Sequence, residues 1–326
     1  MKLLRVIAEN VRALPDGAYT FAHPVTGMVI DTALVTGPAG SGKTTLLEAI
    51  VVAKERIAGY GPPPNPRSLL RRGANNGRVV VTFVLDPDEL ARAGQNEPVQ
   101  PVEAWLSGGG SGTRVDPRMG KLLSDFSEGA SRLCYFPAQR RLDPPQPVER
   151  APSSRDLVRL CVDREGDKFG PVVRWICQRL AADQSALAAQ LVSTGVALAS
   201  HAPDGLAAFR KALAAMCPQL RLANLPPESG MPWFERVDGA TLTLDELSDS
   251  ERDAVLLSGT CALFAFRRSI VLIDRLDLFA CGQLEESWLA ALATLAPDCQ
   301  FVVTTSGDGA SSSEAHVVRL GGGART

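Results

Sequence analysis

The stretch from Gly37 to Thr44 has the residue types and spacing of a phosphate-binding loop, GxxxxGK[ST]. An apolar run from Val29 to Val35 leads into it, and apolar residues at helical intervals lead out of it: Leu46, Leu47, Ile50 and Val51. Glycines let the backbone wrap around a phosphate with its N–H groups pointing inward, and the positive end of the helix dipole adds attraction. The alternative is a glycine turn that precedes a helix by chance.

In a loop of this kind the lysine reaches the β- and γ-phosphates of a nucleotide, and the hydroxyl that follows binds Mg²⁺. We therefore predict ATP and Mg²⁺ as cofactors, Lys43 as a catalytic and phosphate-binding residue, and Thr44 as a metal ligand. The residues expected to surround the phosphates are Gly37, Pro38, Ala39, Gly40, Ser41, Gly42, Lys43, Thr44 and Thr45.

A carboxylate near the end of the chain is the natural partner of this loop. Four aliphatic residues, 270–273, lead directly to Asp274, a pattern typical of a buried parallel strand. The carboxyl end of such a strand faces the ligand site of an open α/β sheet. The sequence therefore predicts Asp274 as a catalytic residue that holds Mg²⁺ through water.

An α/β fold is needed to position these residues, and its elements can be predicted from residue patterns. We expect strands at residues 2–8, 18–21, 25–35, 78–85, 133–136, 300–306 and 315–320, and a short strand pair at 231–234 and 241–244. Helices are expected within residues 153–218 and at 283–295, and no heptad run predicts a coiled-coil arm. Residues 91–117 are rich in Gly, Pro and Gln, which favours a flexible loop or hairpin tip.

Composition limits the class of protein. The chain has 326 residues, 45% of them hydrophobic, with a net charge of −2, which does not predict tight nonspecific binding to nucleic acid. Its seven cysteines form no CxxC pair, which argues against a zinc site or disulfide framework. The N-terminus does not have the pattern of a signal peptide, and no apolar run reaches membrane-spanning length, so we expect a cytoplasmic protein.

The order of these features resembles the ATPase head of the ABC superfamily, in the branch that contains RecF, SMC and OLD-type proteins. The resemblance is carried by residues 9–13 (ENVRA), the run from Gly37 to Ile50, and the order of the later strands. It implies a P-loop NTPase fold of the ABC-ATPase type, with a mixed β-sheet core and an inserted helical lobe. We expect one head over residues 1–326, with a nucleotide-binding lobe at about 1–143 and 232–326 and a helical lobe at about 144–231, after the proline-rich link 144–147.

The resemblance also assigns roles to single residues. Arg12 matches a basic residue that helps hold the phosphates, although an ordinary surface arginine would look the same. Gln139, with Arg140 beside it, matches the Q-loop glutamine that senses the γ-phosphate through Mg²⁺ or the attacking water. Tyr19 is either a base-stacking residue or a half-buried strand tyrosine.

The serine of the family's signature motif has a counterpart in Ser248. In the family this serine opens a helix that reaches the γ-phosphate bound by a second head. Ser248 to Glu251 is also an ordinary capping box, S-x-x-E before an apolar helix. The glycines of the signature are missing, and Asp249 would place a negative charge near a phosphate.

The chain departs from the family in its catalytic residues. Arg275 stands where active members carry a glutamate, and Ser306 or Thr305 stands in place of a switch histidine. Asp277, Glu246 or Glu251 are the carboxylates that could replace that glutamate, and Asp277 is the preferred catalytic candidate.

Three functions follow from the resemblance. The first is an ATPase that closes as a homodimer or higher oligomer and acts on a partner protein or DNA, in a setting such as bacterial defence or genome maintenance. The second is a nucleotide-dependent switch that hydrolyses little or no ATP. The third is a RecF-like DNA clamp, which would use Arg67, Arg71, Arg72, Arg140 and Arg141.

Overall fold

A computed structural model describes residues 1–60, 65–107, 112–125, 127, 130–142, 161–162, 168–194, 204–226, 230–280, 283–306 and 316–320. Several sequence predictions lie outside these residues: most of the glycine-rich tip at 108–111, the proline-rich link at 144–147, and the helical predictions at 153–160 and 195–203. Within the described ranges, no helix has the length and apolar character that a membrane-spanning helix needs.

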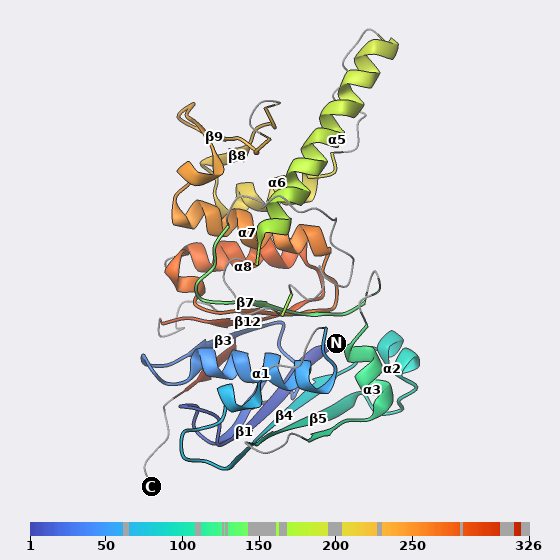
Figure 1. Cartoon of the computed structure of the whole chain (residues 1–326), viewed down its shortest axis with the longest axis vertical. Helices are drawn as coiled ribbons and strands as arrows, with labels where there is room; N and C mark the ends of the chain where they lie inside the picture. Colours follow the sequence, from blue (N-terminus) through green and yellow to red (C-terminus); the bar gives the residue numbers. More distant parts are fainter. Residues whose placement is uncertain are drawn as a thin grey trace.

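Two sheets form the framework (Figure 1). The first is antiparallel, in the order β2-β1-β4-β5-β6. Its strands are β1 (Lys2–Glu9), β2 (Gly17–Thr20), β4 (Asn76–Val84), β5 (Val99–Ser107) and β6 (Thr113–Arg114). The second is parallel throughout, in the order β13-β3-β12-β11-β7. Its strands are β3 (Thr32–Thr36), β7 (Leu133–Phe136), β11 (Ile270–Ile273), β12 (Gln300–Thr304) and β13 (His316–Arg319).

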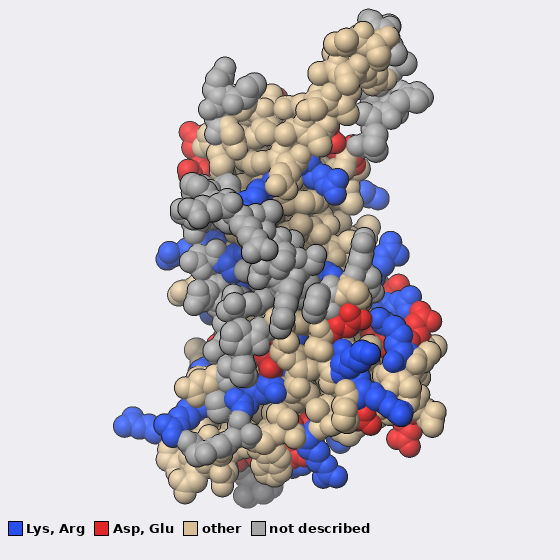
Figure 2. Space-filling view, turned by 45° about the vertical axis from the view of Figure 1, so that its right-hand side comes forward, with Lys and Arg blue, Asp and Glu red and all other residues tan. Residues whose placement is uncertain are grey.

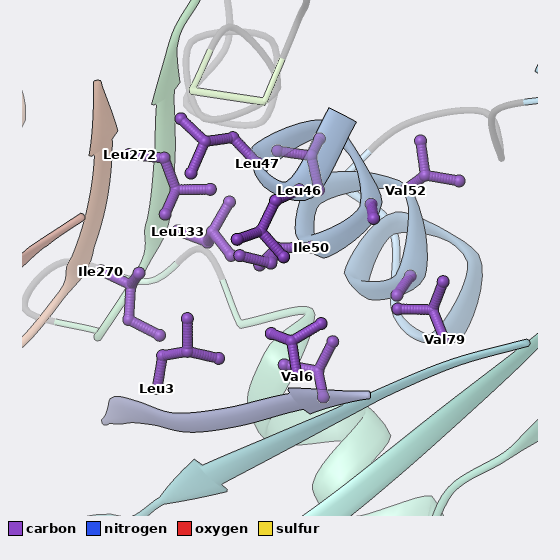
Figure 3. Close-up of a cluster of buried hydrophobic side chains, with 14 of the residues drawn as sticks. Leu3, Val6, Leu46, Leu47, Ile50, Val52, Val79, Leu133, Ile270 and Leu272 are labelled. Atoms are coloured by element: carbon purple, nitrogen blue, oxygen red, sulfur yellow. The ribbon is translucent and has the colours of Figure 1, made fainter. Parts of the chain in front are cut away.

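Helix α1 (Lys43–Ile57) packs between the two sheets (Figures 1 and 3). It is apolar on more than one face, as expected for a helix covered on both sides. Figure 3 shows Leu46 and Ile50 of α1 between Val6 of β1 and Leu272 of β11, and all four side chains are fully buried. This contact fixes the start of α1 at the carboxyl ends of the parallel strands.

A second core covers the other face of the parallel sheet. It contains Phe136, Val271 and Phe301 from the strands and Val255 and Trp288 from the helices. The helices of this layer are α5 (Gly170–Thr194), α6 (Ala207–Met216), α7 (Asp249–Phe264) and α8 (Gln283–Leu295). In Figure 1 the far end of α5 projects beyond the rest of the molecule, and Figure 2 shows only uncharged side chains there among those it describes.

Smaller elements complete the fold. They are a sheet in the order β10-β9-β8, two short helices and three 3₁₀ turns. Their bounds are β8 (Leu220–Leu222), β9 (Phe234–Arg236), β10 (Thr241–Leu242), α2 (Pro87–Ala93), α3 (Pro117–Leu123), η1 (Pro66–Ser68), η2 (Leu244–Glu246) and η3 (Leu276–Leu278).

The strands predicted at residues 2–8, 18–21, 78–85, 133–136, 300–306 and 315–320 are confirmed to within a few residues, as is the helix at 283–295. The strand predicted at 25–35 is wrong for its first part, because only Thr32–Thr36 is a strand and Pro24 to Gly27 form a turn. Gly27, at φ 68°, supplies the left-handed conformation of that turn.

The sequence predicts a flexible loop or hairpin tip over residues 91–117; the antiparallel pair of β5 and β6 agrees with a hairpin, and the flexible-loop alternative is wrong in large part. Residues 99–107 form β5, which lies between β4 and β6. Its alternation of buried and exposed residues was hidden by Pro101, a residue that central strands exclude. Pro101 fits because β6 pairs only with Glu103 and Ala104, so at Pro101 the only neighbouring strand is β4, whose Thr82 lies opposite.

Candidate functional site

The loop before α1 has the backbone of an anion-binding turn. Gly37, Gly40 and Gly42 have φ values of 148°, 78° and 98°. A side chain at Gly37 would place its Cβ 2.5 Å from the Leu320 carbonyl oxygen, so only glycine fits there. Gly42 is the N-cap of α1 and carries no side chain that could accept from the first turn. The N–H groups at the start of α1 are therefore available to donate hydrogen bonds to an anionic ligand.

Lys43 lies over this loop. Its Nζ donates to the carbonyl oxygens of Gly37 and Pro38, at 2.6 and 3.1 Å, and the residue is 9% exposed. The buried hydroxyl of Ser41 has no hydrogen-bond partner in the described part of the chain. The loop thus presents a lysine and a free hydroxyl at the helix start, both suited to phosphate oxygens.

Asp274 meets Thr44 at this edge of the parallel sheet, although the two residues are 230 positions apart. Asp274 is fully buried, and its Oδ1 accepts hydrogen bonds from Thr44 Oγ1 at 3.2 Å and Thr304 Oγ1 at 2.5 Å. Its Oδ2 is buried and has no partner among the described residues. A carboxylate oxygen without a partner beside a threonine hydroxyl fits a hard cation such as Mg²⁺.

The site offers few protein ligands to such a cation. No group of three or more His, Cys, Asp or Glu residues in the described ranges could hold a metal ion. Mg²⁺ commonly takes one or two protein oxygens and completes its shell with phosphate and water. The pair of Thr44 and Asp274 fits that mode of binding and does not fit a metal site built from protein alone.

Replacing Asp274 with Asn should have opposite effects on stability and on metal binding. Without nucleotide, Asp274→Asn should raise the free energy of unfolding by about 1 kcal/mol, because it removes a buried charge with an unsatisfied oxygen. With Mg·ATP, the variant should lose the Mg²⁺-dependent part of its thermal stabilisation. Thermal unfolding without nucleotide, with ATP alone and with Mg·ATP checks both effects. Thr304→Val is the control, because it removes a hydrogen bond to the Asp274 carboxylate without changing the charge of that carboxylate.

Arg275 turns away from the sheet in a left-handed conformation, at φ 55°, and its N–H donates to Thr304 Oγ1 at 2.7 Å. Its guanidinium pairs with Asp277, with Nε 3.0 Å from Oδ1. Ser306 donates to the other oxygen of Asp277. Burial acts to raise the pKa of Asp277, but the hydrogen bonds from Arg275 and Ser306 outweigh it and lower the pKa. The carboxylate is therefore ionised, and both of its oxygens already accept hydrogen bonds.

The other two carboxylates considered for catalysis cap helical turns. Glu246 accepts from the Thr243 N–H at 2.7 Å. Glu251 accepts from the Ser248 N–H at 2.8 Å and pairs with Arg236, with Nη2 2.8 Å from Oε2. Ser248 in turn caps α7, so the capping box predicted for Ser248 and Glu251 is confirmed. A signature-like role for Ser248 stays a prediction.

The Glu251 contacts predict how stability depends on pH. Burial opposes ionisation of Glu251, but hydrogen bonds from Arg236 and Ser248 lower its pKa below 4.5. A lowered pKa contributes stability above the unfolded pKa and loses it as the pH falls through the folded pKa. Compared with Glu251→Gln, the wild type should be more stable at pH 7 by about 1 kcal/mol, because Arg236 is partly exposed. Urea unfolding at pH 7 and pH 3 should show this advantage shrink at the lower pH.

Arg12 and Tyr19 both have internal partners. Arg12 donates from Nη1 to Glu48 Oε2 at 2.5 Å and from Nε to the Ser68 carbonyl, which places it beside α1 one turn after Thr44. Tyr19 is half-buried, and its hydroxyl donates to the Pro15 carbonyl at 2.5 Å. Contact between Arg12 and phosphates stays a prediction, whereas the strand-tyrosine interpretation of Tyr19 matches its position in β2.

The arginine clusters considered for DNA binding divide into internal and exposed members. Arg71 donates to the Leu14 carbonyl at 2.7 Å and to Asp16 Oδ1 at 2.9 Å. Arg140 is fully buried, whereas Arg67, Arg72 and Arg141 are exposed. Figure 2 shows acidic side chains interspersed among the basic ones on the face it presents. The internal contacts of Arg71 and Arg140 reduce the charge available to a DNA phosphate backbone.

Gln139 is exposed in the loop after β7. It borders a cavity of about 510 Å³, together with Arg141, Asp249, Arg252 and Phe279. Two residues that the sequence did not single out also belong to the site: Thr304, which holds Asp274, and Asp253, which pairs with Arg140. Thr304 follows four strand residues in β12, just as Asp274 follows β11, and that shared position is the signal by which it could have been found.

The fold is that of an SMC-type ATPase head, a P-loop fold with parallel and antiparallel sheets. A solved SMC head bound to the C-winged helix domain of ScpA matches 94% of this chain and 91% of its own, with 12% identity and a TM-score of 0.54. The SMC head domain from Thermotoga maritima matches 94% of this chain and 90% of its own, with 14% identity and a TM-score of 0.48. No family model matches the sequence. No curated protein matches it either.

Proposed function

We propose that the chain is an ABC-type ATPase head that binds Mg·ATP at the start of α1. The observation that carries this proposal is the meeting of Thr44 and Asp274 beside the glycine loop, with Asp274 Oδ2 buried and without a partner among the residues that the structure describes. Hydroxyl, carboxylate and loop then offer the hard oxygen ligands and N–H donors that a nucleotide with its metal requires.

The chain's own residues divide the work of binding. The backbone N–H groups between Gly37 and Thr45, which Pro38 lacks, would surround the phosphates, and Lys43 would exchange the Gly37 and Pro38 carbonyls for phosphate oxygens. Thr44 and Asp274 would hold Mg²⁺, which neutralises phosphate charge when bound. Gln139 would sense the γ-phosphate through Mg²⁺ or the attacking water, and Arg12 and the Ser248 of a second copy would approach the phosphates.

Binding of ATP would bring two heads together and change how they engage a partner protein. Support comes from the fold, since one of the matching SMC heads is solved with a winged-helix domain bound to it. A place in the RecF/OLD-like branch, the division into two lobes near residues 143 and 232, a cytoplasmic location and a role in bacterial defence or genome maintenance belong to the same proposal.

A second candidate is a nucleotide-dependent switch that hydrolyses little ATP. The contact between Arg275 and Asp277 favours it, because Arg275 occupies the position of the water-activating glutamate and neutralises the nearest alternative carboxylate. ATP would then shift the protein between two states through its different affinity for each of them. Hydrolysis would depend on whether Asp277 can leave Arg275.

ATP turnover at saturating Mg·ATP separates the two candidates. The comparison uses wild type, Lys43→Ala, Asp277→Ala and Arg275→Glu, with ATP binding and molecular mass measured on the same samples. For the ATPase, we expect turnover that disappears in Lys43→Ala and falls at least about 100-fold in Asp277→Ala. Binding and a mass increase without turnover, together with turnover gained in Arg275→Glu, would establish the switch.

One result would overturn the proposal as a whole. If the wild type neither binds ATP nor changes mass, the loop before α1 is not a nucleotide site. DNA binding that is lost when Arg67 and Arg72 are replaced, and that falls steeply with salt, would instead make the DNA clamp the better account of what the head acts on.

A further inference from the structure

Arg140 is buried at a point where three candidate site elements meet. Its Nε and Nη2 donate to Asp253 Oδ1 and Oδ2 at 2.6 and 2.9 Å. Its Nη1 donates to the Pro137 carbonyl at 3.0 Å and to the carbonyl of Asp274 at 2.6 Å. Both charged side chains are almost completely buried, at 0% and 2% exposure. A guanidinium has five N–H donors in a fixed plane, so these four contacts fix its position.

Arg140 connects its own loop to other parts of the site. Pro137 and Arg140 both belong to the loop after β7, which also carries Gln139, and Asp274 is the candidate Mg²⁺ ligand at the end of β11. Asp253 lies one turn into α7, the helix that Ser248 caps. The ring of Phe279, which follows η3, lies 5.4 Å from the guanidinium carbon. No other contact described above joins all of these segments.

The geometry of this junction makes it sensitive to small displacements. A bidentate pair holds its two partners in one plane at hydrogen-bond distance, so α7 must follow when Arg140 moves. The carbonyl of Asp274 lies in the same residue as the carboxylate that faces the phosphate site. Burial raises the pKa of Asp253 and the guanidinium opposes that rise, so each charge depends on the other.

We propose that Arg140 is a positioning residue that couples Asp274 and the Gln139 loop to the first turns of α7. Nucleotide binding at Asp274 would then move or stiffen the start of α7, and with it the cavity bordered by Gln139, Asp249 and Arg252. This inference rests on the proposed binding of Mg·ATP. It assigns the coupling to one side chain that does not itself touch the nucleotide.

Hydrogen exchange of the amides in residues 247–257, with and without Mg·ATP, tests the coupling. The variant Arg140→Lys keeps the charge but cannot form the bidentate pair together with both carbonyl contacts. In the wild type we expect Mg·ATP to slow exchange in this stretch by about tenfold, a typical strength of coupling between two sites. In Arg140→Lys that change should disappear, while affinity for Mg·ATP stays within about threefold, because the loop around Lys43 is intact.

Arg132→Lys is the matched control. Arg132 is also a buried arginine beside β7, but it donates to the carbonyl of Phe264, at the opposite end of α7, and to the carbonyl of Ser127, in the segment before β7. This variant should keep the response of residues 247–257 to Mg·ATP. If general loosening of the core were the cause, both variants would lose the response.

The outcomes separate this inference from the proposed function. A wild type that fails to bind Mg·ATP overturns the proposed function. A wild type that binds Mg·ATP without any change in residues 247–257, or an Arg140→Lys variant that responds like the wild type, overturns the coupling alone. Loss of the response in both Arg140→Lys and Arg132→Lys also overturns it.

Discussion

Replacing Lys43 with Ala is expected to weaken Mg·ATP binding by about 100-fold or more. Lys43 is the one side-chain cation of the glycine loop, and a charge-assisted hydrogen bond to a phosphate contributes about 1.5–3 kcal/mol. Two such contacts amount to roughly 3–6 kcal/mol, and each 1.4 kcal/mol corresponds to a tenfold change in affinity. Isothermal titration calorimetry with Mg·ATP measures the effect.

The same variant should leave the fold almost unchanged. Among the described residues, Lys43 donates to two acceptors, the carbonyls of Gly37 and Pro38, and both belong to the loop before α1 and not to the core. We expect the free energy of unfolding to change by less than about 1 kcal/mol. Lys211→Ala, which removes an exposed lysine on α6, is the control and should keep full affinity. Equal affinity in Lys43→Ala and wild type would mean that the phosphates bind elsewhere.

Replacing Asp253 with Ala should lower the free energy of unfolding by about 3–5 kcal/mol, the largest effect on stability that we expect. The substitution leaves the Arg140 guanidinium buried at 0% exposure without its counter-charge. Removing one partner of a buried ion pair costs this much because the remaining charge is uncompensated. Urea unfolding at pH 7 and 25 °C measures the difference.

A double substitution tests the cause of that loss. Arg140→Met with Asp253→Leu removes both charges and keeps apolar volume, so it should recover most of the stability lost in Asp253→Ala. The double variant should still bind Mg·ATP, but Mg·ATP should no longer slow hydrogen exchange at the start of α7. If the double variant is as unstable as Asp253→Ala, the loss comes from packing around Val255 and Leu256 and not from the unpaired charge.

Local patterns predicted which segments lie together at the candidate site. The glycines from Gly37 to Gly42 must adopt conformations that other residues avoid, so their spacing shows in the sequence. The position of Asp274 beside Thr44 follows from a general property of parallel sheets, whose strands β3 and β11 end at one edge. These patterns failed where strand pairing overrides the β-propensity of single residues. In β5, Pro101 is accommodated because β4 pairs with it on one side, while β6 pairs only with Glu103 and Ala104.

Residue patterns along the sequence did not predict the contacts of charged side chains. Arg140 looked like the neighbour of Gln139, yet it binds Asp253, 113 positions further along the chain. In the sequence, Arg275 departed from the glutamate of the family and Asp277 was the candidate to replace that glutamate. In the structure the two side chains bind each other. The partners of long polar side chains depend on which segments the fold brings together. The spacing of residues along the chain gives neither their burial nor their distance in space.

The sequence by itself determined the glycine loop before a helix, the buried strand that ends in Asp274 and the order of elements of a P-loop fold. These depend on backbone conformation and on alternation or runs of apolar residues, which act within a few positions. Only the tertiary structure decided that one buried oxygen of Asp274 finds no partner in the described ranges, that Asp277 is neutralised by Arg275, and that Arg140 joins the site to α7. Those features depend on which groups are removed from water together, and that is settled only when distant segments pack.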